Sequence, residues 1–429
     1  MDLTQWLALV VFVGAYILIA TERIHRVAAA LGGAALMLAL GFTDGEAAYY
    51  SHETGIDWNV IFLLFGMMMI VGVIKTTGLF EALAIYAAKR ARGRPYPLMV
   101  LLAVITAVAS ALLDNVTTVL LIAPVTFLVC ERLELKVTPF LIAEVLASNT
   151  GGMATLIGDP PNIIIGSRAG LSFNDFLLNL APLAVIMTIV LVLMMRFMFR
   201  DSFTFNPDRV SEVMALSERD AIRDRTLMWQ SLAVLALVLA GFTLHSVFHY
   251  EPSVVALLGA GLLLLISKVT VQDALVDIEW ETLTFFMGLF VMVGALVETG
   301  VIEEFATWLG ETTGGNLAVS SISILLVSMV ASGIVDNIPY VATMSPVVAS
   351  LAASHPGADG DVLWWALAIG ADLGGNATAV GASANVVVLG MAARYGSPIS
   401  FWEFTKYGIV VVLASAVIST AWLWVRYLA

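Results

Sequence analysis

The chain has 429 residues, of which 60% are hydrophobic and only 12% are charged, whereas soluble domains have about 25% charged residues. This composition excludes an ordinary soluble enzyme and a disordered chain, because both need far more polar residues. The net charge of −13 is not accompanied by a basic stripe, so no nucleic-acid partner is expected. The single cysteine, Cys130, excludes an intrachain disulfide and a multi-thiolate metal site.

Apolar segments follow one another along the chain, beginning with residues 6–20. They are continuous and do not alternate in polarity, so they predict an all-α polytopic membrane protein and not a β-barrel. The first segment lacks a basic leader and a small-residue cleavage site, which predicts a retained helix and not a signal peptide. No glycine-rich run ends in Gly-Lys-Ser or Gly-Lys-Thr, so no ATP site is predicted. We expect no enzyme activity, no catalytic residue, no cofactor and no metal site.

The second half of the chain repeats the first at a nearly constant offset of 222 residues. The recurring residues include Trp58 and Trp280, Gly78 and Gly300, Asp114-Asn115 and Asp336-Asn337, and Gly151-Gly152 and Gly374-Gly375. Chance does not explain so many polar residues and glycines in one register. We therefore predict a first repeat in residues 1–199, a linker in residues 200–228 and a second repeat in residues 229–429.

The basic residues predict how the two repeats insert into the membrane. The loop from Lys89 to Arg94 and the linker are rich in arginine, whereas the segment that matches this loop, residues 298–316, is acidic. Because basic loops face the cytoplasm, the repeats insert in opposite directions, and each has an odd number of crossings. The linker is then cytoplasmic and both ends of the chain lie outside, in a multi-pass protein of the inner (plasma) membrane.

Each half contains six to seven apolar segments, which is too many for five crossings. The excess disappears if residues 97–131 and 316–351 form re-entrant hairpins and residues 138–170 and 362–394 form broken helices. The fold prediction is two inverted-topology repeats with about ten transmembrane helices, two re-entrant hairpins and two broken helices. Inverted repeats with broken helices near the middle of the membrane are typical of secondary transporters.

Four polar islands interrupt the apolar segments and supply the candidate site. An ion that leaves water needs oxygen ligands, which side chains and unwound backbone provide. Asp114 and Asp336 are the proton-coupling candidates, because a carboxyl group inside the membrane can exchange a proton. The substrate- or ion-binding candidates are Asn115, Thr117, Ser148, Asn149, Thr150, Asp159, Asn162, Asn337, Asp372, Asn376, Thr378 and Asn385.

Glycines and a proline pair predict where the two helices break. Glycine readily takes a positive φ angle, and proline donates no amide hydrogen. The helix-break residues are Gly151, Gly152, Gly158, Pro160, Pro161, Gly374, Gly375 and Gly381. Two other interpretations stay open: the glycine pairs could be close-packing contacts between helices, and Asp114-Asn115 could merely cap the helix that begins at Val116.

Two runs of residues resemble the ion transporter superfamily. The first reads Leu-Asp-Asn-Val-Thr-Thr at residues 113–118 and continues to Ala-Pro-Val-Thr at 123–126, and the second reads Gly-Asp-Pro-Pro-Asn at 158–162. The branches that are most similar are the arsenical pump membrane proteins and the melanosomal P proteins. The resemblance implies that the hairpin tips and the two broken helices form one central site. It also implies one of three transport activities: export of arsenite or antimonite, exchange of sodium for protons, or transport of a di- or tricarboxylate.

The acidic tips distinguish this chain from the sodium-coupled carboxylate carriers, whose tips typically read Ser-Asn-Thr. No Arg or Lys lies next to either tip in the sequence, so two fixed acids disfavour an anionic carboxylate and favour proton coupling. On electrostatic grounds arsenous acid and a Na⁺/H⁺ exchanger suit such a site equally well, and the resemblance then favours a proton-coupled antiporter that exports arsenite or antimonite. The alternatives are a Na⁺/H⁺ antiporter and a carrier of di- or tricarboxylates or other anions, and a channel would use the same fold. Its partners are a small inorganic substrate, protons and lipid, and the resemblance allows a separate ATPase subunit.

Overall fold

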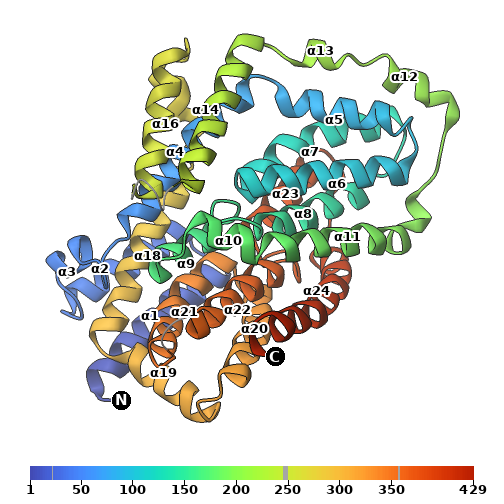
Figure 1. Cartoon of the computed structure of the whole chain (residues 1–429). Coiled ribbons are helices and arrows are strands. Elements are labelled where there is room, and N and C mark those ends of the chain that lie inside the picture. The colour runs from blue at the N-terminus through green and yellow to red at the C-terminus, as the bar shows by residue number, and fades with distance from the viewer. Residues whose placement is uncertain (22, 245–249, 356–357) are drawn as a thin grey trace.

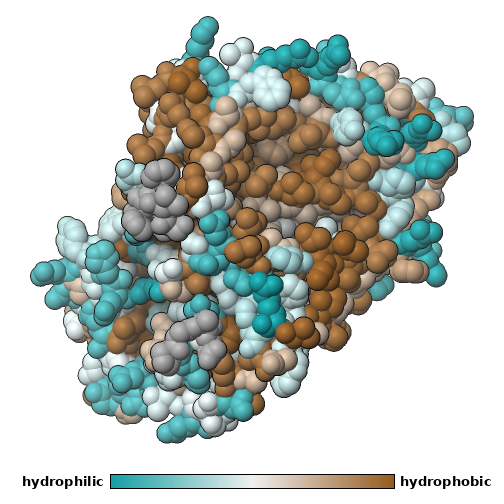
Figure 2. Space-filling model, viewed as in Figure 1, coloured by the Kyte–Doolittle hydropathy of each residue, from teal (hydrophilic) through white to brown (hydrophobic). Residues whose placement is uncertain are grey.

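The computed structural model describes residues 1–21, 23–244, 250–355 and 358–429. In these ranges every regular element is helical, and nine helices are long and apolar enough to cross a membrane. The predicted all-α membrane fold is confirmed. Figure 2 shows apolar side chains over the middle of one face, whereas hydrophilic side chains gather at its upper edge, where Figure 1 places the linker helices α12 and α13.

The first half of the chain ends with a long helix before the linker. Its helices are α1 (Leu3–Thr21), α2 (Arg26–Ala39), α3 (Gly45–Tyr50), α4 (Trp58–Thr76), α5 (Leu79–Arg90), α6 (Pro95–Leu112), α7 (Asn115–Arg132), α8 (Thr138–Gly152), α9 (Pro160–Ala169), α10 (Phe173–Asn179) and α11 (Ala181–Met198). The linker contains α12 (Val210–Met214) and α13 (Glu218–Ala221). It runs along the outside of α5 before the second half begins (Figure 1).

The second half follows the same order. Its helices are α14 (Arg225–Thr243), α16 (Pro252–Ile266), α17 (Val271–Val276), α18 (Trp280–Glu298), α19 (Val301–Thr312), α20 (Leu317–Ile334), α21 (Asn337–Ala353), α22 (Ala358–Gly374), α23 (Ser383–Arg394) and α24 (Phe401–Leu423). The packing repeats as well: α6 packs on α8 as α20 packs on α22, and α7 packs on α23 as α21 packs on α9. The last two contacts join one half to the other.

Two helix pairs meet at the predicted acidic turns. Helix α6 ends at Leu112 and α7 begins at Asn115, while α20 ends at Ile334 and α21 begins at Asn337. The side chain of Asp114 accepts a hydrogen bond from the backbone N–H of Thr117. Both turns are therefore helix starts capped by an aspartate, which satisfies amide groups that have no partner within the helix.

Two further helices are interrupted. Helix α8 ends at Gly152 and α9 begins at Pro160, where a missing amide hydrogen costs nothing at the first helical position. In the second half, the chain is irregular between Gly374 and Ser383. Each irregular segment is held by an asparagine of the helix that follows it. The Nδ2 group of Asn162 in α9 donates to the carbonyl of Thr155, and that of Asn385 in α23 donates to the carbonyl of Thr378.

The glycines at these breaks act by close packing. The expectation of a positive φ angle is wrong for Gly151, Gly152, Gly158, Gly374, Gly375 and Gly381, all of which lie in the described residues. A Cβ atom on Gly151 would lie 2.1 Å from the carbonyl oxygen of Ala107, and one on Gly374 would lie 2.6 Å from that of Met329. Glycine is needed there because the hairpin backbone lies directly against the broken helix.

Candidate functional site

Each hairpin is fixed to the broken helix of its own half by serine and threonine hydroxyl groups. Ser110 donates to the carbonyl of Ser148 at 2.8 Å, and Ser332 donates to the carbonyl of Ala371 at 2.6 Å. The hydroxyl groups of Thr155 and Thr378 donate in the same way to the hairpins. These bonds hold each tip beside a helix break and use hydroxyl groups that would otherwise be unpaired in an apolar interior.

Asp159 joins the two halves at the centre of the protein. Its carboxylate accepts a hydrogen bond from the Nδ2 group of Asn115 at 2.6 Å and contacts the Nδ2 group of Asn337 at 3.3 Å from both oxygens. All three side chains are buried. One carboxylate on the first broken helix therefore holds the tips of both hairpins, so its charge is compensated by amide donors.

Asn149 extends this network into the second broken helix. Its Nδ2 group donates to the Oδ1 atoms of Asn376 and Asn385, both at 3.0 Å. Its Oδ1 atom accepts from Asn115 at 3.2 Å. Side chains from all four predicted polar islands thus meet in one buried network, which we call the central amide network.

The two predicted coupling residues lie at the edge of this network. Asp336 lines a cavity of 380 Å³, and Asp114 lines a second cavity of 460 Å³. The cavities adjoin, because Arg26, Glu281 and Ser383 line both. Both aspartates are half-buried and cap helices, so capping and access to a cavity occur together.

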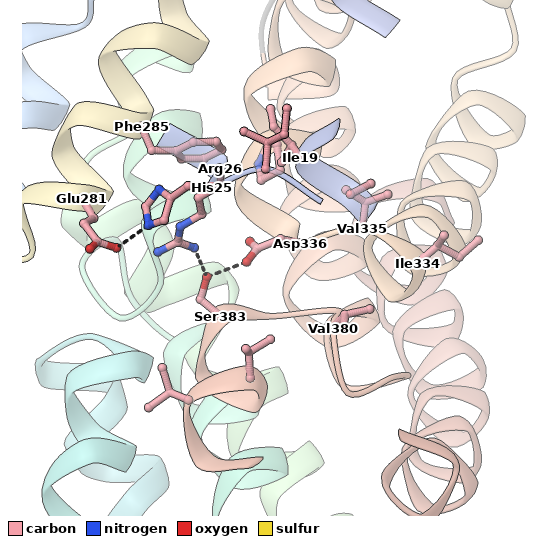
Figure 3. Close-up of a pocket in the computed structure, with 15 residues that line it drawn as sticks. Ile19, His25, Arg26, Glu281, Phe285, Ile334, Val335, Asp336, Val380 and Ser383 are labelled. Carbon is pink, nitrogen blue, oxygen red and sulfur yellow. Dashed lines mark hydrogen bonds and ion pairs between the residues drawn. The ribbon is translucent and has the colours of Figure 1, made fainter. Parts of the chain in front are cut away.

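Arg26 is the site residue that sequence reasoning missed. Its Nη1 atom donates to the hydroxyl group of Ser383 at 3.0 Å, and that hydroxyl group donates to Asp336 at 2.5 Å (Figure 3). The expectation that no Arg or Lys lies beside either tip is therefore wrong. Arg26 is the first residue of α2, and its hydrogen bond to Ser383 depends on how the two halves pack.

Helix starts from both halves surround the two cavities. The residues that line them include Arg26 of α2, Trp280 of α18, Ser383 of α23 and the capping residues Asp114 and Asp336. The amino end of a helix carries a partial positive charge, which stabilises a nearby carboxylate. Four carboxylates, from Asp114, Glu279, Glu281 and Asp336, line the cavities, so the partial charges of the helices are offset by acids of the protein itself.

Three predicted binding residues have local roles. The hydroxyl group of Thr150 donates to the carbonyl of Leu146 one helical turn earlier, and Ser148 donates to the carbonyl of Asn115. Thr117 supplies a backbone amide to the cap of α7. None of these three residues lines either cavity.

Comparisons with known proteins identify relatives over nearly the whole length. The family model described as citrate transporter (CitMHS) matches residues 16–370. An uncharacterized transporter of Mycobacterium bovis is 57% identical over 98% of both chains. The human P protein is 32% identical over 98% of this chain, which spans 60% of that longer protein. The crystal structure of the Alcanivorax borkumensis YdaH transporter has a similar fold, with a TM-score of 0.64, 15% identity and coverage of 94% of this chain and 98% of that one.

Proposed function

Because the chain belongs to the citrate transporter (CitMHS) family, we propose that this membrane transporter is a proton-coupled secondary active transporter. The observation that carries the proposal is the set of carboxyl groups at the junction of the two halves, with Asp159 and Asp372 fully buried. Carboxyl groups inside a membrane protein are costly, and proton transfer is a common reason to keep them. In the proposal, Asp114 and Asp336 take up and release protons at the two cavities.

The proposed membrane is the inner (plasma) membrane, with the linker in the cytoplasm and both ends of the chain outside. The support is the arginine content of the linker and of the loop that precedes α6. In the transport cycle, a hairpin and its broken helix would move as one unit, since Ser110 and Ser332 tie these elements together.

The substrate that we propose is arsenite or antimonite, which the antiporter would export. Arsenous acid is uncharged at neutral pH, so it is not repelled by the four carboxylates that line the cavities. The test is proton-driven uptake of arsenite by everted membrane vesicles. Uptake should fall sharply with Asp114→Asn or Asp336→Asn. If both variants transport as the wild type does, these residues do not couple transport to protons.

A carboxylate carrier is the second candidate, and Arg26 is the observation that favours it. A guanidinium group on the wall of both cavities suits a carboxylate ligand, and the description of the family names citrate. Uptake of radiolabelled citrate that is lost with Arg26→Gln, without any arsenite transport, would select this function. Release of protons on addition of sodium alone would instead select the Na⁺/H⁺ antiporter.

A further inference from the structure

A third cavity, of 330 Å³, lies where α4, α9 and the start of α16 meet. We call it the α4 cavity, and we call the two cavities lined by Asp114 and Asp336 the tip cavities. Residues that correspond in the two repeats line the α4 cavity and the tip cavity at Asp336. The corresponding pairs are Asn59 and Glu281, Leu63 and Phe285, and Ile163 and Val386. The α4 cavity is therefore the counterpart, in the first repeat, of the cavity at Asp336.

The α4 cavity and the tip cavities lie at opposite ends of α4 and α18. A Cβ atom on Gly294, near the end of α18, would lie 1.7 Å from the carbonyl oxygen of Thr54, just before α4 begins. A Cβ atom on the corresponding Gly72, near the end of α4, would lie 2.9 Å from the Cβ atom of Asp277, just before α18 begins. The two helices therefore run in opposite directions. Because a helix rises about 1.5 Å per residue, Asn59 at the α4 cavity lies about 20 Å along α4 from Gly72.

The contact between α4 and α9 separates the α4 cavity from the tip cavity at Asp114. On α4, Leu63 lines the α4 cavity and the next residue, Leu64, lines the tip cavity. On α9, Ile163 lines the α4 cavity, whereas Pro160, about one turn earlier, lines the tip cavity. All four side chains are buried, and α4 packs on α9. The barrier between the two cavities is therefore a thin layer of apolar side chains.

The α4 cavity has a polar mouth and an apolar floor. At the mouth, the hydroxyl group of Ser253 donates to the Oδ1 atom of Asn59 at 2.9 Å. At the floor, Leu156 covers Gly166, where a Cβ atom would lie 2.3 Å from the Cδ1 atom of this leucine. An apolar constriction excludes water and ions without any charged group. The floor thus closes the cavity towards the centre of the protein.

Resting on the proposed transport function, we propose that the α4 cavity is the second mouth of the transport pathway and that Leu63, Leu156 and Ile163 form its closed gate. In this conformation the hairpin tips are reached from one side of the membrane through the tip cavities. Movement of α9 away from α4 joins the α4 cavity to the tip cavity at Asp114, which opens the pathway to the other side. Hydroxyl and amide groups, with one carboxylate from Glu251, line the mouth, so it suits an uncharged polar solute or a cation.

The test is the labelling of single cysteines by a membrane-impermeant maleimide in sealed vesicles of either orientation. The protein is the full chain with Cys130→Ala, which removes its one native thiol. Asn59→Cys and Glu281→Cys are a matched pair, since they correspond in the two repeats and both side chains are exposed. The two cysteines should react from opposite sides of the membrane. Reaction of both from the same side overturns the proposal.

The gate is tested with a cysteine inside the tip cavities. Val387→Cys lines both of them, and it should react at least tenfold faster from their side than from the side of the α4 cavity. Leu63→Ala combined with Ile163→Ala removes buried apolar side chains from the gate, so the two rates should become similar. The matched control is Leu193→Ala with Ile189→Ala, which makes the same changes at exposed side chains of α11 and should keep the tenfold difference. A gate variant that behaves as this control does overturns the proposal.

A second measurement leaves the gate residues intact. Asn59→Cys on α4 and Ser167→Cys on α9 both line the α4 cavity, and a short bifunctional maleimide between them should hold α9 against α4. The residual labelling of Val387→Cys from the side of the α4 cavity should then disappear, and labelling at an unchanged rate would contradict the gate. None of these experiments needs a transported solute. A lack of arsenite transport in everted vesicles would therefore refute the proposed substrate, while the labelling rates still decide the gate.

Discussion

The two halves share their backbone connections but differ in the charges at the centre. Ser110 and Ser332 make equivalent bonds to the broken helices, and Asn162 and Asn385 hold equivalent turns. The carboxylates have no such equivalence, because Asp159 corresponds to Ala382 and Asp372 to Asn149. Duplication therefore supplies a symmetric scaffold, whereas the site at its centre is one asymmetric site and not two copies of a half-site.

A single added methyl group should disrupt the close packing between each hairpin and its broken helix. Gly151→Ala places its Cβ atom 2.1 Å from the carbonyl oxygen of Ala107, against 2.6 Å from that of Met329 for Gly374→Ala. Backbone must move in both variants, so we expect destabilisation at or above the upper end of the ~1–3 kcal/mol typical of overpacking. Thermal unfolding in detergent should show the larger loss for Gly151→Ala.

Gly390→Ala is the matched control, since a Cβ atom there meets no atom within 4 Å. It should unfold at the temperature of the wild type. Equal stability of Gly151→Ala and Gly390→Ala would show that the hairpin does not lie against the first broken helix as described.

The central charge gives the next largest effect. Asp159→Ala makes the first half resemble the second, and it leaves the amide of Asn337 without its acceptor. Each buried donor without a partner costs about 1–3 kcal/mol, so we expect lower thermal stability and loss of transport. Thr405→Val is the control, because the buried hydroxyl group of Thr405 has no hydrogen-bond partner in the described residues. Normal transport by Asp159→Ala would refute a single asymmetric centre.

Local signals explain what the sequence alone could predict. The helix starts after Asp114 and Asp336 and before Pro160 follow from capping and proline chemistry, which act over a few residues. The membrane fold follows from composition. The sequence left the glycine pairs open between unwinding and close packing. The packed structure favours close packing, because Gly151 and Gly374 lie against hairpin backbone more than forty residues away.

The sequence indicates which residues are candidates for the central amide network, but it does not indicate which of them bond to each other. Asp159 bonds to Asn337 across 178 positions, and Arg26 bonds to Ser383 across 357. Such contacts arise where the two halves pack together, and no local pattern encodes them. For the same reason, no pattern near Arg26 in the sequence indicates that it lies at the site.

Loss of Arg26 should affect the two hairpin tips unequally, because Arg26 is linked by hydrogen bonds to the tip at Asp336. It reaches Asp336 through Ser383, whereas Asp114 bonds to the backbone of its own helix. Arg26→Gln should lower transport roughly tenfold, since a hydrogen bond to a charged group contributes ~1.5–3 kcal/mol. Combined with Asp336→Asn, the loss should be smaller than the sum, and combined with Asp114→Asn it should be additive. Equal coupling to both tips would mean that Arg26 acts on the cavity as a whole.

The smallest effect concerns the linker, which is bonded to the first half. Lys89 of α5 bonds to Glu218 at 2.9 Å and holds the pKa of that carboxyl below its usual range. A lowered pKa in the folded state means that this stabilisation is complete at neutral pH and is lost as the pH falls through that pKa. Lys89→Ala should cost at most ~1 kcal/mol. The difference in thermal stability from the wild type should disappear in acid, whereas Lys136→Ala, a change at an exposed lysine, should show no such dependence on pH.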